Sequence, residues 1–267
     1  MTNYMNYFGF NDEPFPSVID LKKVYIYKEL EELVSRIKYT VDTGLVSVIT
    51  GQVGSGKTTS LKYACSQFHP SKYKIIPVIA NSGSILEIFK QITLAFNMEC
   101  STSSITFLIK GIRERLQEIF SKKQKPILVI DEANLMREKI FQEIHNILQY
   151  DFNSRDLMPL ILCGQITLMD KLNYHTAQAL ASRVAGRSHL EGLNTEGMSM
   201  YIIHHLNNCG ISDNLFDEAA ILAIQQGSGG IMRKANNLAR GALVAAASRN
   251  SKLVSAEHVR IAQTELL

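Results

Sequence analysis

The chain has 267 residues, of which 46% are hydrophobic and 20% are charged, and its net charge is +3. This composition is typical of a globular protein with a full core, and so small a net charge does not by itself indicate nucleic acid or anionic membrane as a partner. No apolar run approaches the ~20 residues that span a bilayer, and Met1–Asn11 lacks the basic start and apolar stretch of a signal peptide. We therefore expect a soluble, cytoplasmic protein.

The first two thirds of the chain alternate predicted helices with predicted strands. Tyr7–Pro16 is aromatic and rich in turn residues, and we expect it to be ordered because Phe8, Phe10 and Phe15 need burial. Apolar residues at helical spacing then predict helices over Leu30–Thr43, Thr58–Phe68, Ile85–Phe96, Phe107–Phe120 and Ile140–Tyr150. Short apolar runs predict strands over Leu45–Thr50, Lys74–Ala80, Pro126–Ile130 and Leu157–Cys163. The alternation predicts an α/β fold, a doubly wound parallel sheet with helices on both faces.

The remaining third of the chain has a different pattern, in which no strand is expected. Helices are predicted over Thr195–Cys209, Asp217–Gln226, Ile231–Ser248 and Ser255–Leu266. We interpret residues 194–267 as a small all-helical lid domain, residues 44–193 as the α/β core, and residues 1–43 as an aromatic N-terminal segment with its first helix.

A phosphate-binding motif follows the first predicted strand. The segment Gly51–Thr58 (GQVGSGKT) matches GxxxxGK[ST] in full, with a strand before it and a helix after it. Its glycines let backbone N–H groups turn toward phosphate oxygens, Lys57 reaches the β- and γ-phosphates, and the Thr58 hydroxyl ligates Mg²⁺. The motif therefore predicts a site for ATP with Mg²⁺, in contact with Gly51, Gln52, Val53, Gly54, Ser55, Gly56, Lys57, Thr58 and Thr59.

Two adjacent carboxylates end the buried strand Pro126–Ile130. Asp131 has the position of an acid that holds Mg²⁺ through water, and Glu132 that of a general base that polarises the attacking water. Neighbouring side chains at a strand end point in different directions, so we expect the two acids to divide these roles. A solvated acidic turn is the alternative, and it is disfavoured by the phosphate-binding motif upstream.

Three weaker candidates follow. Gln165, after the strand that ends at Cys163, is expected between the phosphate-binding loop and the acidic pair, where it senses the γ-phosphate or orients water, or is merely a turn residue. Arg183 is our candidate for an arginine that a neighbouring subunit inserts toward the γ-phosphate. Arg187 is the reserve, on the same face if the segment is helical. Surface ion pairs explain both arginines as well.

The helical region also contains basic residues that the sequence alone leaves open. Arg233, after Gly229 and Gly230, either reaches back to the nucleotide or lies in a loop before a helix. Residues 231–260 hold six cations against Glu257, which indicates either a DNA-phosphate contact or a solvated helical face; the cations are Arg233, Lys234, Arg240, Arg249, Lys252 and Arg260. The Tyr7–Phe15 aromatics could wall an adenine ring or simply pack in a core.

The four cysteines do not form a recognisable motif. Cys65, Cys100, Cys163 and Cys209 are far apart and include no CxxC pair, so neither a zinc site nor a redox site is indicated. We expect Cys65 and Cys163, which lie in apolar stretches, to be buried thiols in a reducing compartment.

Taken together, these motifs resemble those of AAA+ ATPases, and more narrowly of the ExeA (general secretion pathway protein A) group. The resemblance covers nearly the whole chain and rests on YFGFNDEPF, LILCGQITLMDKL, ALASRVAGRSHLEGL and GSGGIMRKANNLARGAL. It implies that Gln165 is a sensor residue, that the 181–187 segment bears the intersubunit arginine, and that Arg233 opens a second sensor helix. Met232 departs from the family, which usually has proline there.

The resemblance leaves two biological roles open. The secretion proteins continue into a transmembrane segment and a peptidoglycan-binding domain, neither of which is in this sequence, and similar stand-alone ATPases akin to TnsC and MuB assemble on DNA and recruit a transposase. The leading expectation is an ATP-dependent homo-oligomer bound to double-stranded DNA that regulates transposition. The alternative is an ATPase that energises a secretion or envelope complex through protein partners.

Overall fold

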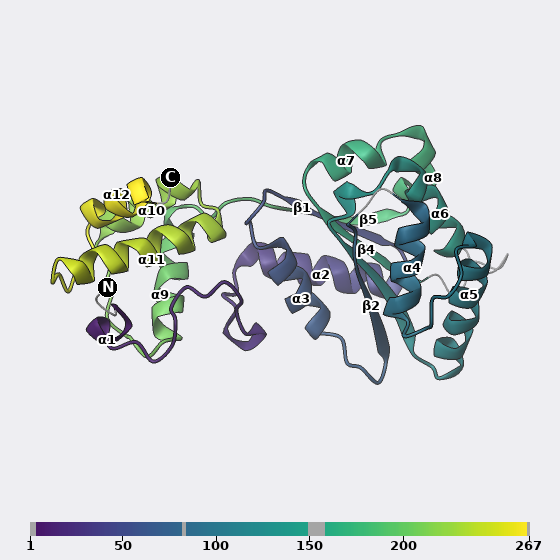
Figure 1. Cartoon of the computed structure of the whole chain (residues 1–267), viewed down its shortest axis with the longest axis horizontal. Coiled ribbons are helices and arrows are strands. Elements are labelled where there is room, and N and C mark those ends of the chain that lie inside the picture. Colours follow the sequence, from purple (N-terminus) through teal and green to yellow (C-terminus); the bar gives the residue numbers. More distant parts are fainter. Residues whose placement is uncertain (1–3, 82–83, 149–157, 266–267) are drawn as a thin grey trace. The chain divides into compact units, whose positions relative to one another are not determined.

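The computed structural model describes residues 4–81, 84–148 and 158–265, and the chain forms two compact units (Figure 1). The α/β unit consists of Lys28–Gly51 and Lys57–Leu190. The helical unit consists of Met1–Tyr27, the short loop Gln52–Gly56, and Glu191–Leu267. The N-terminal segment thus belongs to the same unit as the C-terminal helices.

A five-stranded parallel sheet forms the centre of the α/β unit. The strands lie in the order β2-β3-β4-β1-β5, and every neighbouring pair is parallel. β1, β4 and all but the first residue of β3 are buried, which explains why their sequences are apolar runs rather than alternating patterns. Their bounds are β1 Val46–Gly51, β2 Tyr73–Ile79, β3 Lys125–Asp131, β4 Leu160–Gly164 and β5 Val184–Leu190.

Helices cover both faces of this sheet, as predicted. α2 (Lys28–Thr43) and α3 (Lys57–Ser66) enclose one core with the inner side chains of β1, β3 and β4. α4 (Ile85–Ala95), α5 (Ile105–Ser121) and α6 (Glu138–Leu148) enclose the other (Figure 1). Shorter elements complete the unit, namely η2 Ala133–Leu135, α7 Thr167–Leu172, η3 His175–Ala177 and α8 Gln178–Ala181. Tyr150 and Leu157, at the ends of two predicted elements, lie outside the described residues.

The strand β5 corrects the expectation that Arg183 and Arg187 share a helical face. Arg187 lies within β5, beside Val48 of β1, whereas Arg183 precedes the strand. The inward residues of β5 include the small Gly186 and Ser188, so its period-two pattern lacks the apolar alternation by which a strand is recognised. Gly186 is required by close packing, because a Cβ there would lie 2.9 Å from Thr40 Oγ1.

The helical unit contains α9 (Thr195–Asn207), α10 (Glu218–Ser228), α11 (Met232–Ser248) and α12 (Ala256–Glu265), as the sequence predicted to within a few residues. Side chains cap two of these helices: Asn194 accepts a hydrogen bond from Gly197 N, and Asp217 accepts one from Ala220 N. Leu266, the predicted end of the last helix, lies outside the described residues. No helix in the described part of the chain is long and apolar enough to cross a bilayer.

The N-terminal segment packs against these helices through α1 (Tyr4–Phe8), η1 (Leu21–Lys23) and the residues around them. Phe8, Phe10 and Phe15 are all buried, which confirms that the segment is ordered. His205 donates from Nδ1 to the Pro14 carbonyl at 2.7 Å, and its ring stacks on Phe15. These phenylalanines therefore pack in the core of the helical unit, the simpler of the two alternatives, rather than walling an adenine ring.

Candidate functional site

The carboxyl ends of β1, β4 and β3 carry the predicted catalytic groups at one edge of the sheet. Asp131 is the last residue of β3, and Thr58 lies in the first turn of α3, which follows β1. The Thr58 hydroxyl donates to Asp131 Oδ2 at 2.7 Å, and the Glu132 N–H donates to the other oxygen, Oδ1, at 2.9 Å. Asp131 is buried, so its carboxylate is held in one orientation.

The backbone bends sharply at Glu132, between the strand and the loop. Its φ is 53°, in the left-handed region that non-glycine residues adopt only at a cost. The side chain is half-buried, whereas that of Asp131 is buried. The two carboxylates thus differ in environment, as a division of labour requires; the roles themselves remain predictions.

Gln165 directly follows β4, the strand between β1 and β3, and its role at the site stays a prediction. Its backbone N–H donates to Asn134 Oδ1 at 2.8 Å. Asn134 is buried, and a Cβ on Gly164 would lie 2.5 Å from that same oxygen. Asn134 therefore fixes the loop that carries Gln165. Sequence reasoning missed it, although an amide just after the acidic pair was a visible signal.

Two further polar contacts at this edge of the sheet were also missed. Thr50 Oγ1 and His189 Nδ1 lie 2.9 Å apart at the ends of β1 and β5. Burial, followed by the proximity and hydrogen bonding of Asp131, raises the pKa of the Cys163 thiol, so Cys163 is a neutral donor toward the carboxylate.

Burial raises the pKa of Cys65 to about 11, as expected for an unreactive thiol.

The phosphate-binding loop Gln52–Gly56 has the backbone that its sequence predicts. Gly54 and Gly56 both have a φ of 87°, which requires glycine. Within the helical unit the loop contacts the start of α11: the Arg233 N–H donates to the Gly54 carbonyl at 3.1 Å, and a Cβ on Gly56 would meet the Met232 sulfur at 3.1 Å. Ser55 Oγ is buried and has no partner among the described residues, so the loop retains an unused polar atom.

Arg183 lies at the amino ends of the strands, whereas Thr58 and Asp131 lie at the carboxyl ends. Its carbonyl accepts from the N–H of Val46, the first residue of β1. Gly51 is five residue steps further along that strand, about 16 Å at ~3.3 Å per step. Burial lowers the pKa of Arg183, and burial followed by this arginine's charge lowers the pKa of His145. The Arg183 side chain thus cannot reach the carboxyl ends of the strands in its own sheet, where Thr58 and Asp131 lie.

The donors at the sheet edge suit a hard cation bound mainly through a nucleotide. The described residues contain no group of three or more His, Cys, Asp or Glu that could hold a metal. The Thr58 hydroxyl and the Asp131 carboxylate are oxygen donors 2.7 Å apart, and Mg²⁺ is commonly held by few protein oxygens, with water and phosphate completing its shell. The residues present therefore fit Mg²⁺ bound together with a nucleotide.

The basic face predicted in residues 231–260 is largely engaged in contacts within the helical unit. Arg240 pairs with Glu13, and Arg249 and Arg260 both pair with Glu257. Lys252 donates to the Tyr7 carbonyl and lies 4.1 Å from the centroid of that ring. Contacts within the helical unit therefore engage four of the six cations, and the acids that pair with them are Glu13 and Glu257.

Comparisons with known proteins match this geometry to a recognised domain. Residues 41–172 match a family model described as an AAA domain. General secretion pathway protein A of Aeromonas hydrophila is 24% identical over 265 residues. That alignment covers 98% of this chain and 48% of the relative, so the chain spans about half of the relative's length.

Two solved structures share the fold at low identity. The ORC2 protein of Aeropyrum pernix, in its ADPNP-ADP complexes, has a TM-score of 0.71 at 15% identity, covering 96% of this chain and 72% of that one. The ORC1 protein of Aeropyrum pernix, in complex with DNA, has a TM-score of 0.67 at 15% identity, covering 91% and 67%. The expected fold class, a P-loop parallel sheet of the AAA+ type with a helical C-terminal region, is confirmed.

Proposed function

We propose that this chain, with its AAA+ fold and the AAA domain match over residues 41–172, binds ATP with Mg²⁺ and hydrolyses it to ADP and phosphate. The observation that carries the proposal is the 2.7 Å contact between the Thr58 hydroxyl, in the first turn of the helix that follows β1, and Asp131, the last residue of β3. This contact brings the two oxygen donors of the phosphate-binding motif and the acidic pair together although they are 73 residues apart in sequence. A glycine-rich turn that does not bind phosphate would not require the contact between Thr58 and Asp131.

The chain's own groups would bind the triphosphate as follows. The N–H groups of the Gly51–Thr58 loop point at phosphate oxygens, and Lys57, which is 7% exposed, neutralises the β- and γ-phosphates. Thr58 and Asp131 would hold Mg²⁺ through their side-chain oxygens. The metal, when bound, draws electron density from the phosphates and offsets their negative charge. Thr59 and Arg233 are further proposed contacts with the nucleotide.

Glu132 would act as the general base, since it is the carboxylate that is not engaged by Thr58. It accepts a proton from the attacking water, and Gln165, fixed by Asn134 on the neighbouring strand, orients that water or senses the γ-phosphate. The strand order supports this arrangement, because Gln165 follows β4 and Glu132 follows the neighbouring strand β3.

Arg183 would act on a neighbouring subunit. It lies at the far edge of the sheet, so hydrolysis that depends on it requires a second copy to bring Arg183 to the nucleotide edge of the first. Such an arginine accelerates hydrolysis by ~10³–10⁵ because it offsets charge that builds up in the transition state. We therefore propose an ATP-dependent homo-oligomer whose ATPase activity increases with assembly.

The test is the concentration dependence of ATP hydrolysis by Arg183→Ala, with Arg187→Ala as the matched control. The wild type and Arg187→Ala should gain specific activity as protein concentration rises, because assembly supplies the missing cation. Arg183→Ala should bind ATP normally and show no such gain. A rise in Arg183→Ala equal to that of the wild type would remove the assignment.

The target of this ATPase activity has two candidates. A DNA-bound regulator of transposition remains the leading role from the sequence, and the ORC1 structure gives an example of the fold in complex with DNA. The internal ion pairs of residues 231–260 weaken one support for it. A role in a secretion or envelope complex through protein partners draws on the general secretion pathway relative. In either role we place the protein in the cytoplasm. We propose that its domains are the N-terminal segment 1–43, the α/β core 44–193 and the helical lid domain 194–267.

Co-sedimentation with duplex DNA, with and without a non-hydrolysable ATP analogue, distinguishes the two roles. Binding that requires the analogue and weakens as salt is added supports the DNA-linked role, because contacts with phosphates release counterions. Absence of binding at low salt removes that role and leaves the protein-partner role. Lys234→Ala tests whether an exposed cation at the start of α11 contributes.

A further inference from the structure

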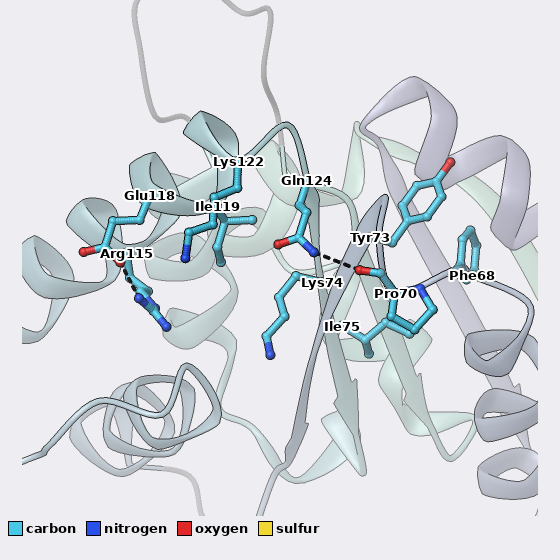
Figure 2. Close-up of a pocket in the computed structure, with 10 residues that line it drawn as sticks. All are labelled: Phe68, Pro70, Tyr73, Lys74, Ile75, Arg115, Glu118, Ile119, Lys122 and Gln124. Carbon is cyan, nitrogen blue, oxygen red and sulfur yellow. Dashed lines mark hydrogen bonds and ion pairs between the residues drawn. The ribbon is translucent and has the colours of Figure 1, made fainter.

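A groove lies beside the edge strand β2, at the end of the sheet opposite to Thr58 and Asp131. Its volume is about 400 Å³, within the usual range of ligand sites. The loop before β2, the first residues of β2 and the last turns of α5 line it. The Gln124 side chain donates to the Pro70 carbonyl at 2.8 Å and so links two of these segments at the rim (Figure 2).

The backbone of β2 presents unused hydrogen-bonding groups to this groove. Lys125 N donates to Lys72 O, and Ala80 N donates to Asp131 O, so the even-numbered residues of β2 direct their backbone groups to β3. The odd-numbered residues direct theirs outward, where the described residues supply no further strand. The Tyr73 carbonyl and both backbone groups of Ile75 therefore face the groove with no partner among the described residues.

The two walls of the groove differ in character, as Figure 2 shows. On one face of β2, Tyr73 and Ile75 pack with Phe68 against the core under α3, and their exposed parts form an apolar wall. On the other face, Lys74 extends beside Arg115 and Lys122 of the α5 region. Three cations thus face one carboxylate, Glu118, which already pairs with Arg115.

We propose that this groove binds an extended acidic segment of a partner protein, which adds as a strand to the outer edge of β2. Successive side chains of an added strand point to opposite faces, so one set would meet Lys74, Arg115 and Lys122 and the other set the apolar wall. A segment in which acidic and apolar residues alternate satisfies both walls at once. The free backbone N–H and carbonyl of Ile75 supply the hydrogen bonds that pair the added strand with β2.

Pro77 limits the length of the added strand. It is an odd-numbered residue, so the N–H that it lacks would have faced outward, and the edge beyond it cannot continue a regular ladder. The addition is therefore confined to the amino end of β2, beside the groove. The same proline protects the rest of the edge, where the exposed Ile79 would otherwise invite unspecific pairing.

Fluorescence anisotropy of labelled synthetic peptides with the full chain tests the proposal. The probe is a short peptide that alternates glutamate with valine, compared with its lysine–valine counterpart and with a version that is N-methylated on the backbone at alternate positions. The acidic peptide should bind, more weakly at high salt. The basic peptide and the N-methylated peptide should not bind, because one has the wrong charge and the other cannot pair.

Variants then locate the binding site. Lys74→Glu with Lys122→Glu should weaken binding of the acidic peptide roughly tenfold, whereas Lys38→Glu, on the exposed side of α2, should leave it unchanged. Ile75→Pro should abolish binding without removing any bond to β3, and circular dichroism will check that it folds. If Ile75→Pro does not fold, the N-methylated peptide provides the backbone test on the wild type.

The proposal is overturned if the acidic peptide does not bind, binds the double lysine variant as tightly as the wild type, or binds equally well when N-methylated. Displacement of the acidic peptide by a short DNA duplex would also overturn it, since the groove would then be a nucleic-acid surface.

Discussion

The two units of the molecule bury polar side chains for different reasons. In the α/β unit the buried Lys57, Asp131 and Asn134 lie near the carboxyl ends of the strands, at the predicted nucleotide site. In the helical unit the buried His205 and His258 bond to the chain itself, one to the Pro14 carbonyl and the other to Ser255. The buried groups of the first unit thus lie at the predicted site, whereas in the second unit His205 attaches the distant N-terminal segment.

Glu132→Gln should give the largest effect and test the first half of this contrast. We expect turnover to fall by ~10²–10⁴, the usual contribution of a general base, while ATP binding and thermal stability stay at wild-type values. Steady-state phosphate release measures turnover, and a thermal melt measures stability. A variant that loses stability, or that still turns over ATP at the wild-type rate, would show that Glu132 is structural.

Phe15→Ala tests the second half. Phe15 is fully buried between His205 and Phe216, so truncation should lower the free energy of unfolding by ~3–5 kcal/mol. Val18→Ala, at a side chain that is 82% exposed, is the matched control and should change it by less than ~0.5 kcal/mol. Urea unfolding followed by circular dichroism makes the comparison. Equal stability of the two variants would contradict the packing of the N-terminal segment.

The pH dependence of stability tests the same attachment through His205. Burial lowers its pKa from 6.5 to about 4, opposed by the hydrogen bond to Pro14, so the folded chain keeps the ring neutral. Between pH 6.5 and 4 the unfolded chain binds a proton that the folded chain does not. The free energy of unfolding should therefore fall by about 3 kcal/mol as pH drops through that window and be unaffected above it.

His205→Gln removes the titrating ring and can still donate to the Pro14 carbonyl. Between pH 6.5 and 4 its free energy of unfolding should change less with pH than that of the wild type, as measured by urea titrations at each pH. An identical slope in the two proteins would mean that other groups cause the acid sensitivity.

The contrast between the units also explains what the sequence alone could predict. The phosphate-binding loop and the acidic pair were readable because binding a triphosphate demands particular residues at fixed spacing, next to strands with an apolar signature. β5 was missed because its inward positions include Gly186 and Ser188, which fit closely under α2 and carry no apolar signal.

Contacts between segments far apart in sequence were beyond this reasoning. Nothing in the sequence of residues 231–260 predicts that Arg240 pairs with Glu13, or that Lys252 lies over the Tyr7 ring, and these contacts engage part of the basic region within the helical unit. Asn134 is an intermediate case, since its amide is visible in the sequence but its partner, the backbone of Gln165, is set by the order of the strands.

Equilibrium binding of ATP in the presence of Mg²⁺, measured by calorimetry for the wild type and for Lys57→Ala, tests the central claim most directly. The wild type should bind, and removal of the buried ammonium that we propose faces the β- and γ-phosphates should weaken binding by at least ~100-fold, because charge-assisted bonds to phosphate are among the strongest in proteins. A wild-type protein that does not retain ATP, or a Lys57→Ala protein with the same affinity, would contradict the account.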